Sequence, residues 1–128
     1  MNSCPCCSGN TYDTCCKPYH TKQKNAESAE KLVRSRFSAF AIPNGAYLIN
    51  TTLPAKRKFH NEKELQEWGE INHWKQLEII ATPAVNQVEF KAYYDDDDGE
   101  PQLHHELSVF QKISDRWFYV TGEFLNDK

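Results

Sequence analysis

All five cysteines of this chain lie within its first sixteen residues, and none follows Cys16. A structural zinc ion is held by four thiolate or imidazole ligands in a tetrahedron, at Zn–S distances of about 2.3 Å. A short segment can supply these ligands if it carries two pairs and doubles back between them. Cys4 with Cys6 and Cys15 with Cys16 are two such pairs, and residues 8–10 (Ser-Gly-Asn) are typical of a chain reversal. The clustering therefore predicts a metal-binding knuckle.

Two further side chains leave the ligand set open. Cys7 is a fifth thiol, and Cys4 with Cys7 has a spacing that many zinc ribbons use. His20 adds an imidazole shortly after the cluster. Four thiolates around zinc form a closed, structural site without a position for water, which points away from catalysis by the metal. Iron is the alternative metal, because four thiolates suit both ions.

The number and arrangement of the cysteines favour reduced thiols over disulfides. Five is an odd number, and neighbouring cysteines such as Cys15 and Cys16 bridge only through a strained ring. The first residues lack the apolar stretch of a secretory signal, and no apolar run reaches the ~18 residues of a membrane span. We therefore expect a cytoplasmic protein whose thiols hold metal. Thiol redox chemistry or a labile metal site is the alternative.

Length and composition are those of one folded domain with a short N-terminal addition. The chain has 128 residues, of which 39% are hydrophobic, and this is enough for one core. We predict a metal-binding knuckle over residues 1–24 and a folded domain over residues 25–128. The formal net charge of −3 disfavours nucleic acid as the main partner.

Hydrophobic periodicity in the second part predicts helices followed by strands. Apolar residues at helical spacing follow Ser28, a favourable N-cap, and stop at residues 43–45 (Pro-Asn-Gly). Shorter helices are predicted over residues 46–51 and 62–72. From Trp74 the period changes to two, which predicts strands over residues 74–81, 88–94, 103–113 and 117–122. This order indicates an α+β fold in which helices cover one face of an antiparallel sheet.

The cysteine segment resembles a known motif. Its pattern Cys4-Pro5-Cys6-x-Ser8-Gly9-x-x-Tyr12-x-x-Cys15-Cys16 is similar to the SEC-C metal-binding motif, best known from the C-terminal tail of the protein-export ATPase SecA. This resemblance implies Cys4, Cys6, Cys15 and Cys16 as the ligands. The motif usually has glycine where this chain has Cys7.

Nearly the whole chain is similar to the bacterial YchJ-like family. The similarity is carried by the cysteine segment and by residues 32–40 (LVRSRFSAF), 88–94 (VEFKAYY), 106–110 and 116–119. The resemblance implies a nuclear-transport-factor-two-like (NTF2-like) domain, a cone made by a curved antiparallel sheet wrapped around helices. It implies no reaction, because none is established for the family.

Two arginines on the first long helix are candidates for the inside of the cone. Arg34 and Arg36 are two residues apart, so we expect one to face the interior and the other to meet solvent. A buried Arg36 would need an acidic partner, for which Glu106 and Glu89 are available. This pattern predicts a structural ion pair, with an anion site inside a pocket as the alternative.

One face of the strand over residues 103–113 carries His104, Glu106, Ser108 and Phe110. Side chains two residues apart on a strand lie about 7 Å from each other, which is too far for a direct contact between nucleophile and base. We therefore assign no catalytic residue and expect a polar patch in a pocket. The acidic run over residues 95–98 is interpreted as a solvated hairpin turn, because it lacks the ligand spacing of a calcium loop.

These observations favour a zinc-binding interaction or accessory protein, in which the knuckle either has a structural role or docks a protein partner. The alternative from a different class is a small-molecule-binding domain or enzyme. It would use an acid–base site in the cone drawn from Glu106, Arg36 and His104.

Overall fold

The computed structural model describes residues 3–125 of the chain. Short elements come first: η1 (Tyr12–Thr14), α1 (Lys17–His20), α2 (Ala29–Ala41), α3 (Gly45–Asn50), η2 (Pro54–Phe59) and α4 (Glu62–Ile71). Four strands follow: β1 (His73–Ala84), β2 (Gln87–Asp95), β3 (Pro101–Ile113) and β4 (Arg116–Phe124). The predicted order of helices and then strands is confirmed, whereas α1 and η2 had no clear signal in the sequence.

Side-chain caps define where the helices begin. Ser28 accepts a hydrogen bond from the Lys31 amide at 3.1 Å, and α2 starts at the next residue. Asn61 does the same for α4 through the Glu64 amide at 3.0 Å. Both caps satisfy a backbone donor that has no partner inside its helix. The predicted starts of these two helices are therefore confirmed, and so is the predicted cap at Ser28.

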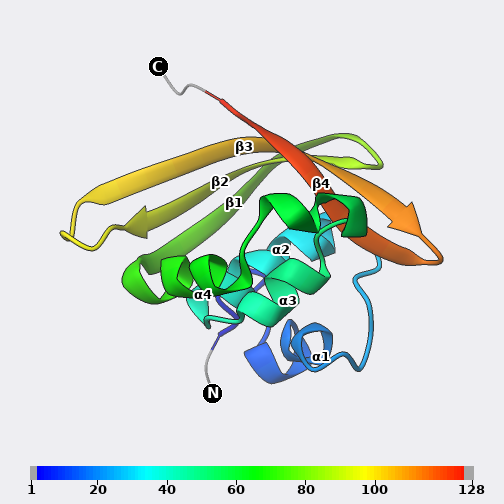
Figure 1. The fold of residues 1–128 in the computed structure, drawn as a ribbon. Helices are drawn as coiled ribbons and strands as arrows, with labels where there is room; N and C mark the ends of the chain where they lie inside the picture. Colours follow the sequence, from blue (N-terminus) through cyan, green and yellow to red (C-terminus); the bar gives the residue numbers. More distant parts are fainter. Residues whose placement is uncertain (1–2, 126–128) are drawn as a thin grey trace.

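The four strands form an antiparallel sheet in the order β1-β2-β3-β4. Register shifts occur three times in the β1–β2 pairing and once in the β3–β4 pairing, between Val109 and Phe110. Such irregularities bend and twist the strands that contain them. Figure 1 shows the resulting curved sheet above helices α2, α3 and α4, with α1 on the other side of these helices. The predicted α+β class with a curved antiparallel sheet is confirmed.

The main core lies between the helices and the concave face of the sheet. Leu32 of α2, Leu48 of α3 and Val88 of β2 are fully buried in it. A second link joins the two layers, because the Tyr119 amide donates to the Thr51 carbonyl at 2.7 Å and the segment after α3 pairs with β4 in parallel. No helix within residues 3–125 has the length and apolar character needed to cross a bilayer.

Candidate functional site

The thiols of Cys4, Cys6, Cys15 and Cys16 come together beside α2. Their sulfur atoms all lie within 4.8 Å of one another. The Cys6–Cys15 and Cys15–Cys16 sulfur distances are 3.6 and 3.9 Å. The edge of a tetrahedron with Zn–S bonds of about 2.3 Å is about 3.8 Å long, so both distances suit a shared metal. These four cysteines could hold a metal ion.

A tight reversal of the chain brings the two cysteine pairs together. The Cys4 amide donates to the Asn10 carbonyl at 2.8 Å, and Ser3 pairs with Thr11 in an antiparallel bridge. Gly9 takes a φ of 91° between these two pairings. The side chains of Cys4, Cys6 and Cys16 are buried and that of Cys15 is half-buried. The reversal lies where the Ser-Gly-Asn sequence predicted it.

Cys7 is separate from this cluster. Its thiol is exposed, and its nearest polar partners are the Pro5 carbonyl at 3.5 Å and the Leu77 amide at 3.4 Å. Its φ is 64°, in the left-handed region that glycine adopts most readily. The backbone at this position therefore explains why the SEC-C motif usually has glycine here.

His20, the other alternate ligand, has both ring nitrogens engaged elsewhere. Nε2 donates to the Ser35 carbonyl at 2.9 Å, and Nδ1 accepts from the Tyr12 hydroxyl at 2.8 Å. Burial lowers the pKa of His20, which favours the neutral imidazole that this arrangement needs. His20 thus links the knuckle to α2 through hydrogen bonds.

Helix α2 also holds the cysteine segment directly. Arg34 Nη1 donates to the Cys6 carbonyl at 2.7 Å, and its Nε donates to Glu30 at 3.1 Å. The Ser38 hydroxyl lies 3.4 Å from the Cys4 sulfur. Of the Arg34/Arg36 pair, Arg34 meets solvent only in part, because the knuckle covers the side of α2 on which it lies and leaves 24% of its side chain exposed.

The thiols also affect one another's protonation. Hydrogen bonding from Cys16 and Cys4 holds the pKa of Cys6 below its ordinary value, while hydrogen bonding with Cys4 and Cys6 raises the pKa of Cys16. Proton sharing of this kind leaves the cluster partly protonated on its own. A divalent cation would favour the loss of the remaining protons, because thiolates and not thiols are metal ligands.

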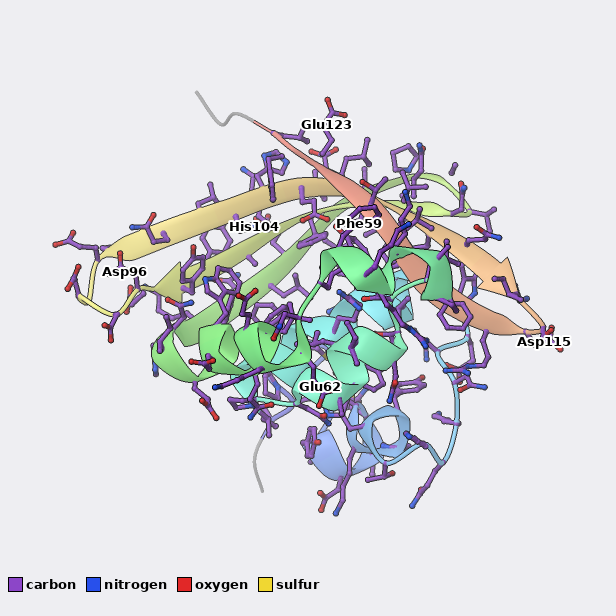
Figure 2. The ribbon with its side chains drawn as sticks, viewed as in Figure 1. Phe59, Glu62, Asp96, His104, Asp115 and Glu123 are labelled. Atoms are coloured by element: carbon purple, nitrogen blue, oxygen red, sulfur yellow. The ribbon has the colours of Figure 1, made fainter. Side chains whose placement is uncertain are left out.

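A cavity of about 190 Å³ lies on the other side of α2, against the sheet. Its polar end is formed by Arg36, His60, His104, Glu106, Ser108 and Tyr119, and most of the remaining wall is apolar or aromatic. Figure 2 shows His104 on β3, nearer to the turn at Asp96 than to the turn at Asp115. The predicted polar face of this strand therefore does line a pocket.

Glu106 is the centre of a hydrogen-bond network at the polar end. His104 Nε2 donates to Oε1 at 2.7 Å, while the Ser108 hydroxyl and the Tyr119 hydroxyl, the latter at 3.1 Å, donate to Oε2. Burial raises the pKa of Glu106, but these hydrogen bonds outweigh it and hold the pKa below its ordinary value.

The expectation that His104, Glu106 and Ser108 are too far apart for direct contact was wrong. The estimate of about 7 Å applies to side chains that stand straight out from a strand. Glu106 is long enough to place one carboxylate oxygen beside His104 and the other beside Ser108.

Gly122, which sequence reasoning missed, makes room for this carboxylate. It lies opposite Ser108 in the β3–β4 pairing. A Cβ atom at Gly122 would overlap the carboxylate of Glu106 and would lie 2.8 Å from its Cγ. No local signal in the sequence connects these two positions, because the contact depends on the strand register.

Arg36 is the arginine of the pair that faces the cavity, and its partners differ from those expected. Nη1 donates to the Leu48 carbonyl at 2.9 Å and to the Thr51 hydroxyl at 2.7 Å, with Thr52 at 3.5 Å. The guanidinium carbon lies 4.7 Å from the centre of the Tyr119 ring. The predicted ion pair with Glu106 or Glu89 was wrong, since Tyr119 bonds to Glu106 in its place and Glu89 pairs with His105 at 2.7 Å.

The acidic run forms a turn stabilised by its own second residue. Asp96 Oδ1 accepts the amides of Asp98 and Glu100 at 3.0 and 2.9 Å. The interpretation as a solvated hairpin turn is confirmed, because this carboxylate caps backbone donors of the turn.

Comparisons with known proteins agree with this architecture. The family model YchJ_M-like, described as the middle NTF2-like domain of YchJ, matches residues 28–122. A UPF0225 protein from Haemophilus influenzae strain PittEE is 40% identical over 121 residues, which cover 91% of this chain and 75% of the relative. A UPF0225 protein from Geobacter sulfurreducens is 40% identical over 127 residues, covering 94% and 78%.

Two solved structures are similar over nearly the full chain. The solution structure of a SEC-C motif containing protein from Rhodopseudomonas palustris has a TM-score of 0.87 and 35% identity, covering 98% of this chain and 100% of that one. The crystal structure of a SEC-C motif containing protein from Psychrobacter arcticus has a TM-score of 0.81 and 32% identity, covering 100% and 85%. The chain therefore belongs to the YchJ-like, UPF0225 family, with an NTF2-like domain and with SEC-C motif proteins as its structural relatives.

Proposed function

We propose that this chain is a zinc-binding accessory protein whose knuckle holds one zinc ion through Cys4, Cys6, Cys15 and Cys16. The observation that carries the proposal is the convergence of these four sulfur atoms to within 4.8 Å. Four thiolates fill a tetrahedral site and leave no position for water, so the role of the zinc is structural. The SEC-C motif of the structural relatives supports the same ligand set.

The surroundings of the cluster suit a charged metal site. Four thiolates around Zn²⁺ carry a net charge of about −2, which needs nearby donors or cations. The Ser38 hydroxyl is within reach of the Cys4 sulfur, and the Ser8 hydroxyl lies 3.1 Å from the Cys15 sulfur. The Arg34 guanidinium, bonded to the Cys6 carbonyl, adds a positive charge beside the cluster. These residues would orient and stabilise the ligands.

The contacts with α2 favour a structural role for the metal over a docking role. Three of the four cysteines are buried, and the knuckle bonds to Arg34, Ser35 and Ser38 of the helix. Zinc would thus fix the first part of the chain against the cone. The outer surface of the knuckle, including the exposed Asn10 and Asp13, is where a protein partner would dock in the accessory role.

Elemental analysis of protein purified under reducing conditions tests the proposal. We expect one zinc per chain, loss of that zinc in Cys6→Ser, and full retention in the matched variant Cys7→Ser. Absence of stoichiometric metal from the unmodified protein, or loss of metal in Cys7→Ser with retention in Cys6→Ser, would contradict it. If the analysis finds one iron per chain and no zinc, the four cysteines hold iron, the other metal that four thiolates bind, and the proposed zinc is wrong.

Thiol titration separates the metal site from the redox alternative. With zinc bound, four thiols should react slowly and Cys7 rapidly, and a chelator should make all five reactive. A redox pair would instead form a disulfide under mild oxidation of the metal-loaded protein.

A further inference from the structure

The Arg36 guanidinium lines the cavity and, within residues 3–125, forms no hydrogen bond or ion pair with a carboxylate, although Glu106 attracts it across the cavity. Within residues 3–125, its hydrogen bonds run from Nη1 to one carbonyl and two hydroxyl groups, all of them neutral. Nε and Nη2 donate to no group in the part of the chain that the structure describes. Neither nitrogen is among the fully buried side-chain atoms of this part of the chain that lack a partner, so both remain open to a group that enters the cavity.

Glu106 is not a hydrogen-bond partner of Arg36. Both of its carboxylate oxygens are already occupied, Oε1 by His104 and Oε2 by Ser108 and Tyr119. Tyr119 presents its hydroxyl to Glu106 and its ring face to Arg36. The carboxylate of Glu106 therefore attracts Arg36 only at longer range, and Arg36 keeps Nε and Nη2 as donors for another group.

The rest of the cavity wall suits a flat apolar body. Phe40, Trp68, Trp74 and Phe90 line it together with Leu65. A dry cavity of about 150 Å³ is large enough for benzene. At about 190 Å³, this cavity has room for one ring and a small substituent. Trp68, which is 37% exposed, and the half-buried His60 line it near the surface and mark a route of entry.

We propose that the cavity binds a small carboxylate that carries a single aromatic ring. The carboxylate accepts hydrogen bonds from Nε and Nη2 of Arg36, whose planar fork matches its two oxygens, and the ring packs against Phe40, Trp68 and Trp74. This inference goes beyond zinc binding and uses no residue of the knuckle, so it stands or fails independently of the metal.

Titration of the full, zinc-loaded chain with benzoate and with benzamide tests the ligand class. The two probes have the same ring and differ in charge. Fluorescence is a suitable signal because Trp68 and Trp74 line the cavity, and amide chemical shifts locate the site. We expect saturable binding of one benzoate per chain and binding of benzamide that is weaker by about tenfold or more, since hydrogen bonds to charged groups are the stronger ones. Absence of benzoate binding, or equal binding of benzamide, would overturn the proposal.

Substitution of Arg36 tests the anchor. Arg36→Gln should weaken benzoate binding by about tenfold or more. The matched control is Arg116→Gln, which removes an exposed arginine outside the cavity and should change the affinity by less than about twofold. Equal affinities of these two variants would contradict the role of Arg36.

A second variant tests the site if Arg36→Gln does not fold. Leu65→Trp adds volume at a partly buried position of the cavity wall and should abolish benzoate binding. Ile71→Trp makes a similar addition at an exposed position of the same helix and should leave it unchanged. Binding that persists in folded Leu65→Trp would place the ligand outside the cavity and overturn the proposal.

Discussion

Helix α2 has a buried polar region on each side, and the two regions are built in different ways. The knuckle has a small buried cluster of Cys4, Cys6 and Cys16, and within residues 3–125 the partly buried hydrophobic side chains that pack against it are those of Tyr12 and Cys15. The cavity is surrounded by the main core, with buried side chains from three helices and the sheet. A segment without aliphatic core residues needs a cross-link to stay folded, whereas the cone has enough apolar burial of its own. The comparison predicts that the folded state of the knuckle depends on bound metal, whereas the stability of the cone depends on side-chain packing.

Metal removal should have the largest effect, and only on the knuckle. With a chelator, we expect the Cys4 and Cys15 amides, which bond to the Asn10 and Tyr12 carbonyls, to lose protection from hydrogen exchange by about a thousandfold or more, because metal binding supplies the folding free energy of such segments. Amides in the centre of β2 and β3 should keep their protection. Zinc added back should restore the exchange pattern. Equal loss of protection in β3 would show that the two regions do not fold separately.

A side chain at Gly122 should damage the cavity and spare the metal site. Gly122→Ala places a methyl group in the space of the Glu106 carboxylate, and we expect the free energy of unfolding to fall by about 2 kcal/mol with zinc still bound. Urea denaturation measures this loss. The double variant Glu106→Ala/Gly122→Ala should lose at least about 1 kcal/mol less stability than the sum of the losses in the two single variants. Strict additivity would show that the steric contact is not the cause.

Acid should remove the contribution of Glu106 to stability. Because hydrogen bonds hold the pKa of this carboxyl below that of the unfolded chain, its stabilising effect is complete above the unfolded pKa of about 4.3 and is lost as pH falls through the folded pKa. The difference in free energy of unfolding between the unmodified protein and Glu106→Gln should therefore shrink below about pH 4.3. A difference that stays constant between pH 3 and pH 6 would contradict the assignment.

Position 7 should show the smallest effect. The left-handed backbone at Cys7 favours glycine, so Cys7→Gly should be more stable than Cys7→Ala by about 1 kcal/mol, with zinc bound in both. Thermal unfolding of the two zinc-loaded variants measures the difference. An advantage of Cys7→Ala would mean that the backbone relaxes when the thiol is removed.

Features that depend on neighbours in the sequence could be predicted. Ser28 and Asn61 cap helices through amides three residues later, and the change of period at Trp74 marks the start of the sheet. The cysteine pairs and the Ser-Gly-Asn reversal likewise lie within one short segment. In each case the physical cause acts over a few residues, so the pattern itself contains it.

Features that depend on strand register and side-chain reach could not be predicted. The long side chain of Glu106 brings His104 and Ser108 to a shared carboxylate. Tyr119, from the neighbouring strand, takes the place expected for Arg36 beside Glu106. The attachment of Arg34 to the knuckle also depends on how two distant segments pack. Period and spacing identify the face on which a side chain lies but not the group that it meets across that face.

The close approach of Glu106 to Gly122 also bears on how relatives of this protein can diverge. Position 122 tolerates a side chain only if position 106 loses its long one, because both compete for the same space. The two positions should therefore change together among homologues. A chain that keeps glutamate at 106 should keep glycine at 122, whereas one with a short residue at 106 is free to vary there.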